Sequence, residues 1–221
     1  MTAFAPTHHP NPPLLSAAAC GALSPAVSRI LAAHAAMCAL CRAAMKKLEA
    51  VGGAALEDEE PVALASDALE KALARIGREQ IAPTPLPQAL SALPRPVHDI
   101  VAPAIHKMSW RFGAPGLKIL DLDLPAAAVG ETFRLFRIEP GSGPPRHTHG
   151  GREFTLVLTG AFKDETGIYR PGDLEIGDEA VTHKPIAEPG ELCYALAVTT
   201  APLKFKGPLG VLQRVLKFGR S

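Results

Sequence analysis

Residues 141–160 read GSGPPRHTHGGREFTLVLTG, and this stretch decides the fold of the second half of the chain. His147 and His149 are two residues apart, so in a β-strand both side chains point to the same face and can reach one ion. Glu153 follows the Gly150-Gly151 turn, at the start of the next predicted strand, and can close on the same point. The stretch therefore predicts a strand–turn–strand unit that carries metal ligands.

The sequence around this unit has the pattern of an antiparallel β domain. Short β-leaning runs alternate with Gly and Pro turns, at 117–122, 132–138, 154–158, 192–198 and 211–218. Such runs at this spacing are typical of an antiparallel sandwich or barrel. We therefore expect a β domain over residues 105–221.

His183 is the candidate fourth ligand of the cluster. It follows a predicted turn, Pro171-Gly172-Asp173, that leads into another strand. Three imidazoles and one carboxylate suit zinc, iron, manganese or nickel, so ligand type alone does not select the metal. The alternative is a metal-free domain in which these polar side chains are hydrogen-bonded to one another.

The spacing G-x5-HxH-x3-E-x6-G within residues 141–160 resembles the first motif of the cupins, and every defined position is matched. The second cupin motif is matched less well, because the Pro-Gly-Asp turn and the later histidine are present but no Asn lies four residues beyond it. The resemblance implies a cupin barrel with a bound metal. The implied ligands are His147, His149, Glu153 and His183.

A second ligand-rich stretch lies upstream, where His34, Cys38 and Cys41 fall within eight residues as HxxxCxxC. These positions are i, i+4 and i+7, so one helical face, or a helix end followed by a tight turn, brings them together. Zinc takes thiolate sulfur and imidazole nitrogen in a tetrahedral set, and Cys-x2-Cys is a common half of it. His9 is the preferred candidate for the fourth ligand, and His8 and Cys20 are the alternatives.

Two other interpretations of HxxxCxxC stay open on the residues alone. A Cys-x2-Cys pair can be a redox pair, but that function favours a βαβ context, and this region is Ala-rich and helical in pattern. His34 can also be a packed core residue, because it shares one helical stripe with Val27, Ile30 and Leu31.

The rest of the first half predicts a small all-α domain. We expect a short helix over 14–22, then a helix that begins at Ser24-Pro25, turns near Cys38 and ends by Gly52-Gly53. A further helix is expected from Ser66-Asp67 to Gly77.

The apolar stripe of that last helix consists of Leu69, Leu73 and Ile76, and we expect it to pack on its own domain or else to face a partner. Prolines between 81 and 103 predict a linker without helix. The predicted organisation is a zinc-binding helical domain at 1–85, a Pro-rich linker at 86–104 and a cupin domain at 105–221. The fold class is α+β multidomain.

Composition restricts the classes of partner. The 221 residues carry 23 basic and 22 acidic side chains, so no electrostatic footprint for nucleic acid or an anionic membrane is present. No run of about 20 apolar residues exists and no secretory signal is recognised, which predicts a soluble, cytoplasmic protein. A protein partner is expected.

The combination of an upstream histidine, HxxxCxxC and a cupin resembles the ChrR-type anti-sigma factors over nearly the whole chain. The resemblance places the helical zinc site on His9, His34, Cys38 and Cys41. It implies that the helical domain sequesters an extracytoplasmic-function-type sigma factor, and that a metal-bound cupin, with zinc or another divalent ion, is needed for release under singlet oxygen or organic hydroperoxide.

The alternative function is a metal-dependent cupin enzyme, a dioxygenase or isomerase, with a helical appendage. Two features favour the regulator. An enzyme does not need a second metal site in a separate domain, and the barrel offers few further acid–base groups, namely Tyr169, Asp173, Cys193 and Tyr194. The sequence therefore predicts no catalytic residues.

Overall fold

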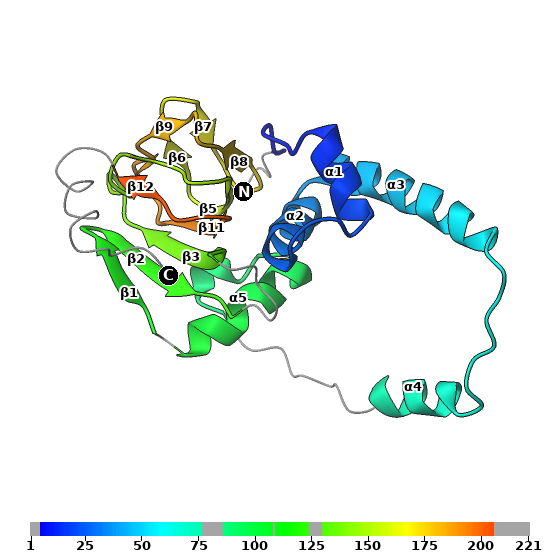
Figure 1. Cartoon of the computed structure of the whole chain (residues 1–221). Helices are drawn as coiled ribbons and strands as arrows, with labels where there is room; N and C mark the ends of the chain where they lie inside the picture. The colour runs from blue at the N-terminus through cyan, green and yellow to red at the C-terminus, as the bar shows by residue number, and fades with distance from the viewer. Residues whose placement is uncertain (1–4, 77–85, 108, 124–129, 206–221) are drawn as a thin grey trace.

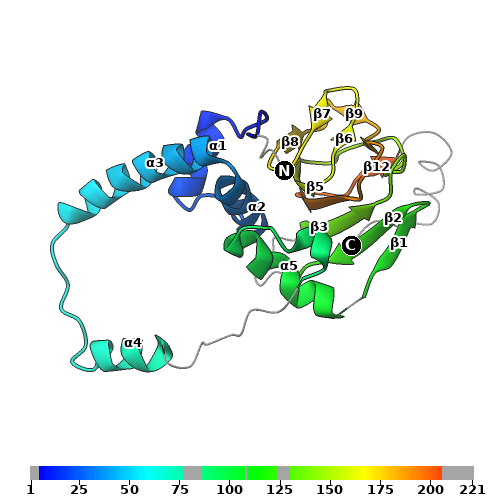
Figure 2. The same ribbon diagram turned by 180° about the vertical axis from the view of Figure 1, so that it is seen from behind.

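The computed structural model describes residues 5–76, 86–107, 109–123 and 130–205, and Figures 1 and 2 show it from opposite sides. Helices come first along the chain and antiparallel strands second, as the sequence predicts. The helices are α1 (Pro12–Ala19), α2 (Pro25–Met37), α3 (Ala39–Glu57), α4 (Ala68–Ile76), the 3-10 helix η1 (Gln88–Leu90) and α5 (Arg95–Lys107). The predicted strand at 211–218 lies outside the described residues.

Capping side chains explain where the first two helices begin. The Asn11 side chain accepts a hydrogen bond from the backbone N–H of Leu14 at 3.0 Å, and prolines occupy the first turn of α1, where a missing N–H costs nothing. This helix therefore begins two residues before the expected start. Ser24 caps α2 in the same way, with Pro25 at its first position, as predicted.

The third helix, α3, is longer than predicted. It continues through Gly52-Gly53 and ends at Glu57, so the expected stop at the glycines is wrong. Glycine weakens a helix by about 1 kcal/mol relative to Ala but terminates it mainly when it adopts positive φ. The residues that follow, Ala54, Ala55 and Leu56, are strong helix formers and carry the helix on.

The prolines of the expected linker also do not prevent helix formation. Helix α5 begins at Arg95 and places Pro96 in its first turn, where proline fits, and it tolerates Pro103 in its interior. Its buried residues Val97, Val101 and Ala104 recur every three or four positions. Burial of this stripe therefore outweighs the cost of the interior proline, which composition alone did not reveal.

The strands of the described chain form one large antiparallel sheet and two small ones. The six-stranded sheet has the order β1-β2-β3-β11-β5-β8, and the three-stranded sheets have the orders β10-β6-β7 and β12-β4-β9. The strands are β1 (Arg111–Ala114), β2 (Leu117–Asp121), β3 (Thr132–Ile138), β4 (His147–Thr148), β5 (Glu153–Thr159), β6 (Phe162–Lys163), β7 (Ile168–Tyr169), β8 (Leu174–Gly177), β9 (Thr182–His183), β10 (Ile186–Ala187), β11 (Cys193–Thr199) and β12 (Lys204–Phe205).

One hydrophobic core joins the helical region to the large sheet. Ile30 and Leu31 of α2, Val101 of α5, and Phe154 and Leu156 of β5 are all fully or almost fully buried in the same cluster. In Figure 1, α2 and α5 lie beside the large sheet. The helical half and the strand-rich half of the chain are therefore packed against each other.

The distal part of the helical region leaves this core. Cys41 is the only residue of α3 that is buried, and α4 has none. Leu69 and Ile76 of α4 are 71% and 72% exposed, so the expectation that this stripe packs on its own domain is wrong. Figures 1 and 2 show α4 standing away from the other elements at the end of an arm.

Within the described residues, no single helix is long and apolar enough to cross a membrane. The consecutive helices α2 and α3 reach the required length and hydropathy only together, and they are bent by 120° at their junction.

Candidate metal centres

Three elements bring the HxxxCxxC ligands and His9 together. His34 lies in the last turn of α2, Cys38 forms the junction between α2 and α3, and Cys41 lies in the first turn of α3. Cys38 has extended backbone angles, φ −115° and ψ 109°, which end one helix and begin the next, as the predicted turn requires. His9 comes from the segment before α1, so it is His9 that the structure places beside the other three.

The geometry of this cluster fits a tetrahedral zinc ion. The Nδ1 atom of His9 lies 3.5 Å from the Sγ atoms of both Cys38 and Cys41. Zn–S and Zn–N bonds of about 2.3 and 2.0 Å at the tetrahedral angle place sulfur and nitrogen about 3.5 Å apart. The four ligand atoms all lie within 4.8 Å of one another.

Two further observations favour a cation in this cluster. Among the described residues, Nε2 of His34 is a buried nitrogen without a hydrogen-bond partner, although its Nδ1 donates to the Gly172 carbonyl at 2.8 Å. Burial and the neighbouring Cys38 sulfur raise the pKa of the Cys41 thiol to about 12. A zinc ion would satisfy both the unpaired imidazole nitrogen and the two adjacent buried thiols, because zinc binds neutral imidazole and thiolate.

The second cluster lies inside the β domain. His147 is in β4, His183 is paired with it in β9, Glu153 begins β5, and His149 follows β4 directly. All four side chains are at least 93% buried. The structure thus brings together the four residues that the sequence singled out, although they come from a three-stranded sheet and from the six-stranded sheet.

The inward atoms of this second cluster are spaced like ligands of one ion. Glu153 Oε2 lies 3.0 Å from His149 Nε2 and 3.6 Å from both His147 Nε2 and His183 Nε2. The Nε2 atoms of His147 and His183 are 3.1 Å apart. Tetrahedral bonds of about 2.0 Å predict ligand separations of about 3.3 Å.

Each imidazole of the second cluster is oriented by a hydrogen bond from its other nitrogen. His147 Nδ1 donates to the Pro145 carbonyl at 2.8 Å, and His149 Nδ1 donates to the Asp178 carbonyl at 2.9 Å. His183 Nδ1 instead meets two carboxyl groups, Asp164 at 2.7 Å and Glu175 at 2.9 Å. Such partners fix the tautomer that leaves Nε2 free for a metal.

The charges of the second cluster are strongly coupled. Burial alone would raise the pKa of Glu153, but hydrogen bonds from the three imidazoles hold it well below its usual range. Burial alone would lower the pKa of His183, yet its bonds to Glu153 and Glu175 raise it to about 11. The buried carboxyl groups therefore favour the protonated form of the His183 imidazole.

Sequence reasoning missed the carboxyl pair behind His183. Burial raises the pKa of Glu175 to about 7, whereas hydrogen bonds from Glu175 and Thr166 outweigh burial and lower that of Asp164 to about 2. Glu175 lies two residues after the Pro-Gly-Asp turn, which is the single signal that could have identified it. Nothing in the sequence near Asp164 distinguishes it from a surface aspartate.

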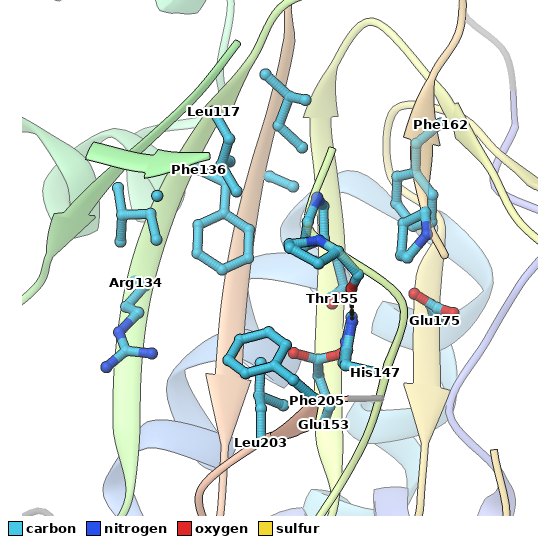
Figure 3. A pocket seen from close by; sticks show the side chains of 17 residues that line it. Leu117, Arg134, Phe136, His147, Glu153, Thr155, Phe162, Glu175, Leu203 and Phe205 are labelled. Atoms are coloured by element: carbon cyan, nitrogen blue, oxygen red, sulfur yellow. Dashed lines mark hydrogen bonds and ion pairs between the residues drawn. The ribbon is translucent and has the colours of Figure 1, made fainter. Parts of the chain in front are cut away.

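A small cavity opens beside the second cluster. Its volume is about 120 Å³, and its polar lining consists of Arg134, His147, Glu153, Thr155 and Glu175. Figure 3 shows Phe136, Leu117 and Phe162 around it, so most of the remaining lining is apolar. An apolar cavity of about 150 Å³ holds a benzene-sized molecule, so this one has room for a few non-hydrogen atoms.

The other candidate acid–base groups do not form a catalytic set. Cys193 is fully buried in the apolar cluster between the sheets, and burial raises its pKa to about 12, so it stays a thiol. Tyr194 belongs to the main hydrophobic core. Asp173 faces the helical region, where its carboxylate accepts backbone hydrogen bonds from Thr7 and His8.

Comparisons with known proteins agree with this architecture. Residues 98–203 match the sequence family described as the ChrR cupin-like domain. The chain is 40% identical over 198 residues to the anti-sigma-E factor ChrR of Cereibacter sphaeroides, and this match covers 90% of the chain and 92% of that protein.

A solved structure covers both halves of the chain. It is the crystal structure of Rhodobacter sphaeroides SigE in complex with the anti-sigma ChrR, which superimposes with a TM-score of 0.69 at 37% sequence identity. The match covers 87% of the chain and 98% of the solved chain. The likeness therefore includes the helical region as well as the β domain.

Proposed function

The chain belongs to the ChrR family of anti-sigma factors, and from this premise we propose how it holds and releases its sigma factor. As a member of this family it is a regulator of transcription rather than an enzyme, and its partner is a sigma factor. The proposal has three parts: the surface that binds an extracytoplasmic-function-type sigma factor, the metals of the two clusters, and release under oxidative stress.

The single observation that carries the binding surface is the exposed apolar arm formed by α3, α4 and their connection. Its large apolar side chains are between 59% and 87% exposed and comprise Leu40, Val51, Leu56, Val62, Leu64, Leu69, Leu73 and Ile76. Isolated exposed leucines are ordinary, but eight on one projecting segment mark an interaction surface. Their burial by the sigma factor supplies the driving force for sequestration.

Zinc in the helical cluster fixes the base of this arm. Its proposed ligands His34, Cys38 and Cys41 span the α2–α3 junction, and His9 ties the N-terminal segment to it. A structural zinc site in a small helical domain supplies much of the domain's folding free energy. The direction in which α3 leaves the core therefore depends on the metal.

The cupin cluster is the proposed sensing element, with zinc or another divalent ion held by His147, His149, Glu153 and His183. Loss of one ligand weakens the set while the apolar core of the sheet stays in place. Singlet oxygen or an organic hydroperoxide would act near this site and bias the protein toward the form that releases sigma factor.

A sigma-dependent reporter in cells tests these assignments. Glu153→Ala and His147→Ala should keep the reporter low without oxidant and blunt its induction by oxidant. Cys38→Ser should give a high reporter signal in both conditions, because the arm is no longer held. Normal induction in the Glu153 and His147 variants would contradict the sensing role of the cupin metal.

Capture of the tagged full-length chain from its own cells tests the partner itself. A sigma factor should co-purify with the wild-type protein and be lost from the Cys38→Ser variant. Recovery of equal amounts of sigma factor with both proteins would contradict the proposed role of the helical zinc site.

A further inference from the structure

One turn of the cupin domain, Pro171-Gly172-Asp173, lies directly against the helical metal cluster. The Gly172 carbonyl accepts the hydrogen bond from Nδ1 of His34 at 2.8 Å, and both groups are buried. This bond leaves Nε2 of His34 as the atom that faces the other ligands. The orientation of a helical-domain ligand is therefore fixed by the backbone of the cupin domain.

The next residue of the turn holds the segment that carries His9. The Asp173 carboxylate, 98% buried, accepts hydrogen bonds from the backbone N–H groups of Thr7 at 2.6 Å and His8 at 3.0 Å. The carbonyl of His8 in turn accepts from the N–H of Leu174 at 3.1 Å. The two residues before His9 are thus held on the cupin by two backbone N–H donors and one backbone carbonyl acceptor.

Close packing accompanies these bonds. Gly172 has φ +91°, and a Cβ atom at this position would lie 2.6 Å from Cγ of Pro6. The ring of His8 also packs on Tyr169 of β7, with ring centroids 4.4 Å apart. The N-terminal segment is therefore closely packed on the cupin surface.

The same short segment reaches the second metal cluster. Strand β8 begins at Leu174, directly after the turn, and Glu175 contacts Nδ1 of His183 at 2.9 Å. Residues 172–175 therefore support one ligand histidine in each cluster, His34 at one end and His183 at the other. No other described residues of the cupin hydrogen-bond to a helical-domain ligand and a cupin ligand within so few positions.

We propose that Gly172 and Asp173 are positioning residues of the helical metal site, so that the cupin domain raises the affinity of that site for its metal. The inference rests on the proposed function in one respect, namely that the helical cluster binds a metal. Outer partners of metal-bound histidines change metal affinity by about 10- to 100-fold when they are removed. Because coupling free energies are reciprocal, a metal bound by the helical cluster also strengthens docking of the cupin.

Cobalt binding to the full-length protein tests the proposal. Of the candidate metal clusters in the described part of the chain, only the helical one contains cysteines, so its Co²⁺ complex is recognised by a sulfur-to-cobalt charge-transfer band that the cupin site lacks. The apparent Co²⁺ affinity of this band is measured by competition with a chelator. We expect Asp173→Ala to weaken it by about 10-fold, the lower end of the range for direct partners of a ligand histidine, because Asp173 acts through the backbone of Thr7 and His8.

A second variant removes the same contact from the other side. Thr7→Pro deletes one N–H donor to Asp173 without changing the cupin turn, and it should weaken the charge-transfer band in the same direction. The matched control is Asp121→Ala, which removes an exposed carboxylate paired with Arg111 and Arg134 on β1 and β3. This control should leave the affinity of the thiolate site unchanged.

The outcomes separate the inference from the function beneath it. Affinities within twofold of wild type in both Asp173→Ala and Thr7→Pro would overturn the positioning role. If Asp173→Ala does not fold, Thr7→Pro alone decides. A wild-type protein without any charge-transfer band would overturn the helical metal site itself, whereas a normal wild-type band with unchanged variants defeats the positioning role alone.

Discussion

Truncation of Leu73 on α4 should weaken sigma binding without destabilising the free protein. This side chain is 59% exposed, and α4 buries none of its residues. Substitution by Ala therefore opens no cavity, and Ala is at least as favourable as Leu in a helix. The free energy of unfolding of the unbound chain should change by no more than about 0.5 kcal/mol.

The expected loss in binding follows from the area that the partner would cover. Full burial of a leucine side chain is worth about 1.5 to 3 kcal/mol, and more than half of this side chain is available to a partner. Truncation should therefore cost about 1 to 2 kcal/mol of binding free energy. This corresponds to a dissociation constant about 5- to 30-fold higher.

Titration calorimetry of the purified chain with its co-purified sigma factor measures this change. The matched control is Ile168→Ala in β7, because Ile168 is also partly exposed, at 40%, but lies in the cupin domain. The reasoning is refuted if Leu73→Ala binds sigma factor as tightly as wild type. It is equally refuted if the control loses as much affinity or if the melting temperature of Leu73→Ala falls sharply.

Three further predictions concern the metals and the division of the chain. Metal analysis should find two equivalents of metal per chain, with zinc in the helical site, and a single equivalent in the wild type would count against two sites. Cys38→Ser should lose one equivalent of metal and much of the helical circular dichroism signal. The zinc affinity of the cupin site should rise about tenfold per pH unit between pH 6 and 8, because the metal must displace the proton held by His183, whose pKa is raised to about 11. Direct zinc titrations of the wild type and of Asp164→Asn, which removes one carboxyl partner of His183, measure this dependence, and a flat pH profile would contradict it. A fragment of residues 1–85, supplied with excess zinc because it lacks the cupin turn that supports His34 and the segment before His9, should bind and inhibit the sigma factor but not respond to oxidant. Binding that still requires the attached cupin would contradict this division.

Much of the candidate metal sites was readable from local spacing. His147 and His149 lie two apart in a strand region, and the period of a strand aims both imidazoles at one point. His34, Cys38 and Cys41 span a helix end, a cap and a first turn, so chain geometry alone brings them near each other. Short-range spacing of this kind survives in the sequence because it does not depend on which surfaces later meet.

Proline and glycine counts were the weaker guide to the helices. Gly52-Gly53 lies within α3, and Pro103 lies within α5, although both patterns predicted a break. The local penalty is about 1 kcal/mol for a glycine and about 3 kcal/mol for a proline in a helix interior. In α5 that penalty is outweighed by burial of an apolar stripe against a sheet that is distant in sequence.

What surrounds the ligands was decided by tertiary structure alone. The partners of His34 and His183 are a glycine carbonyl and two carboxyl groups that lie 138, 19 and 8 residues away in the chain. A backbone carbonyl leaves no signature in the sequence, because every residue type carries one. The amino-acid sequence by itself thus determined which side chains can bind metal, whereas only the packing of the cupin turn on the helices decided which groups orient them.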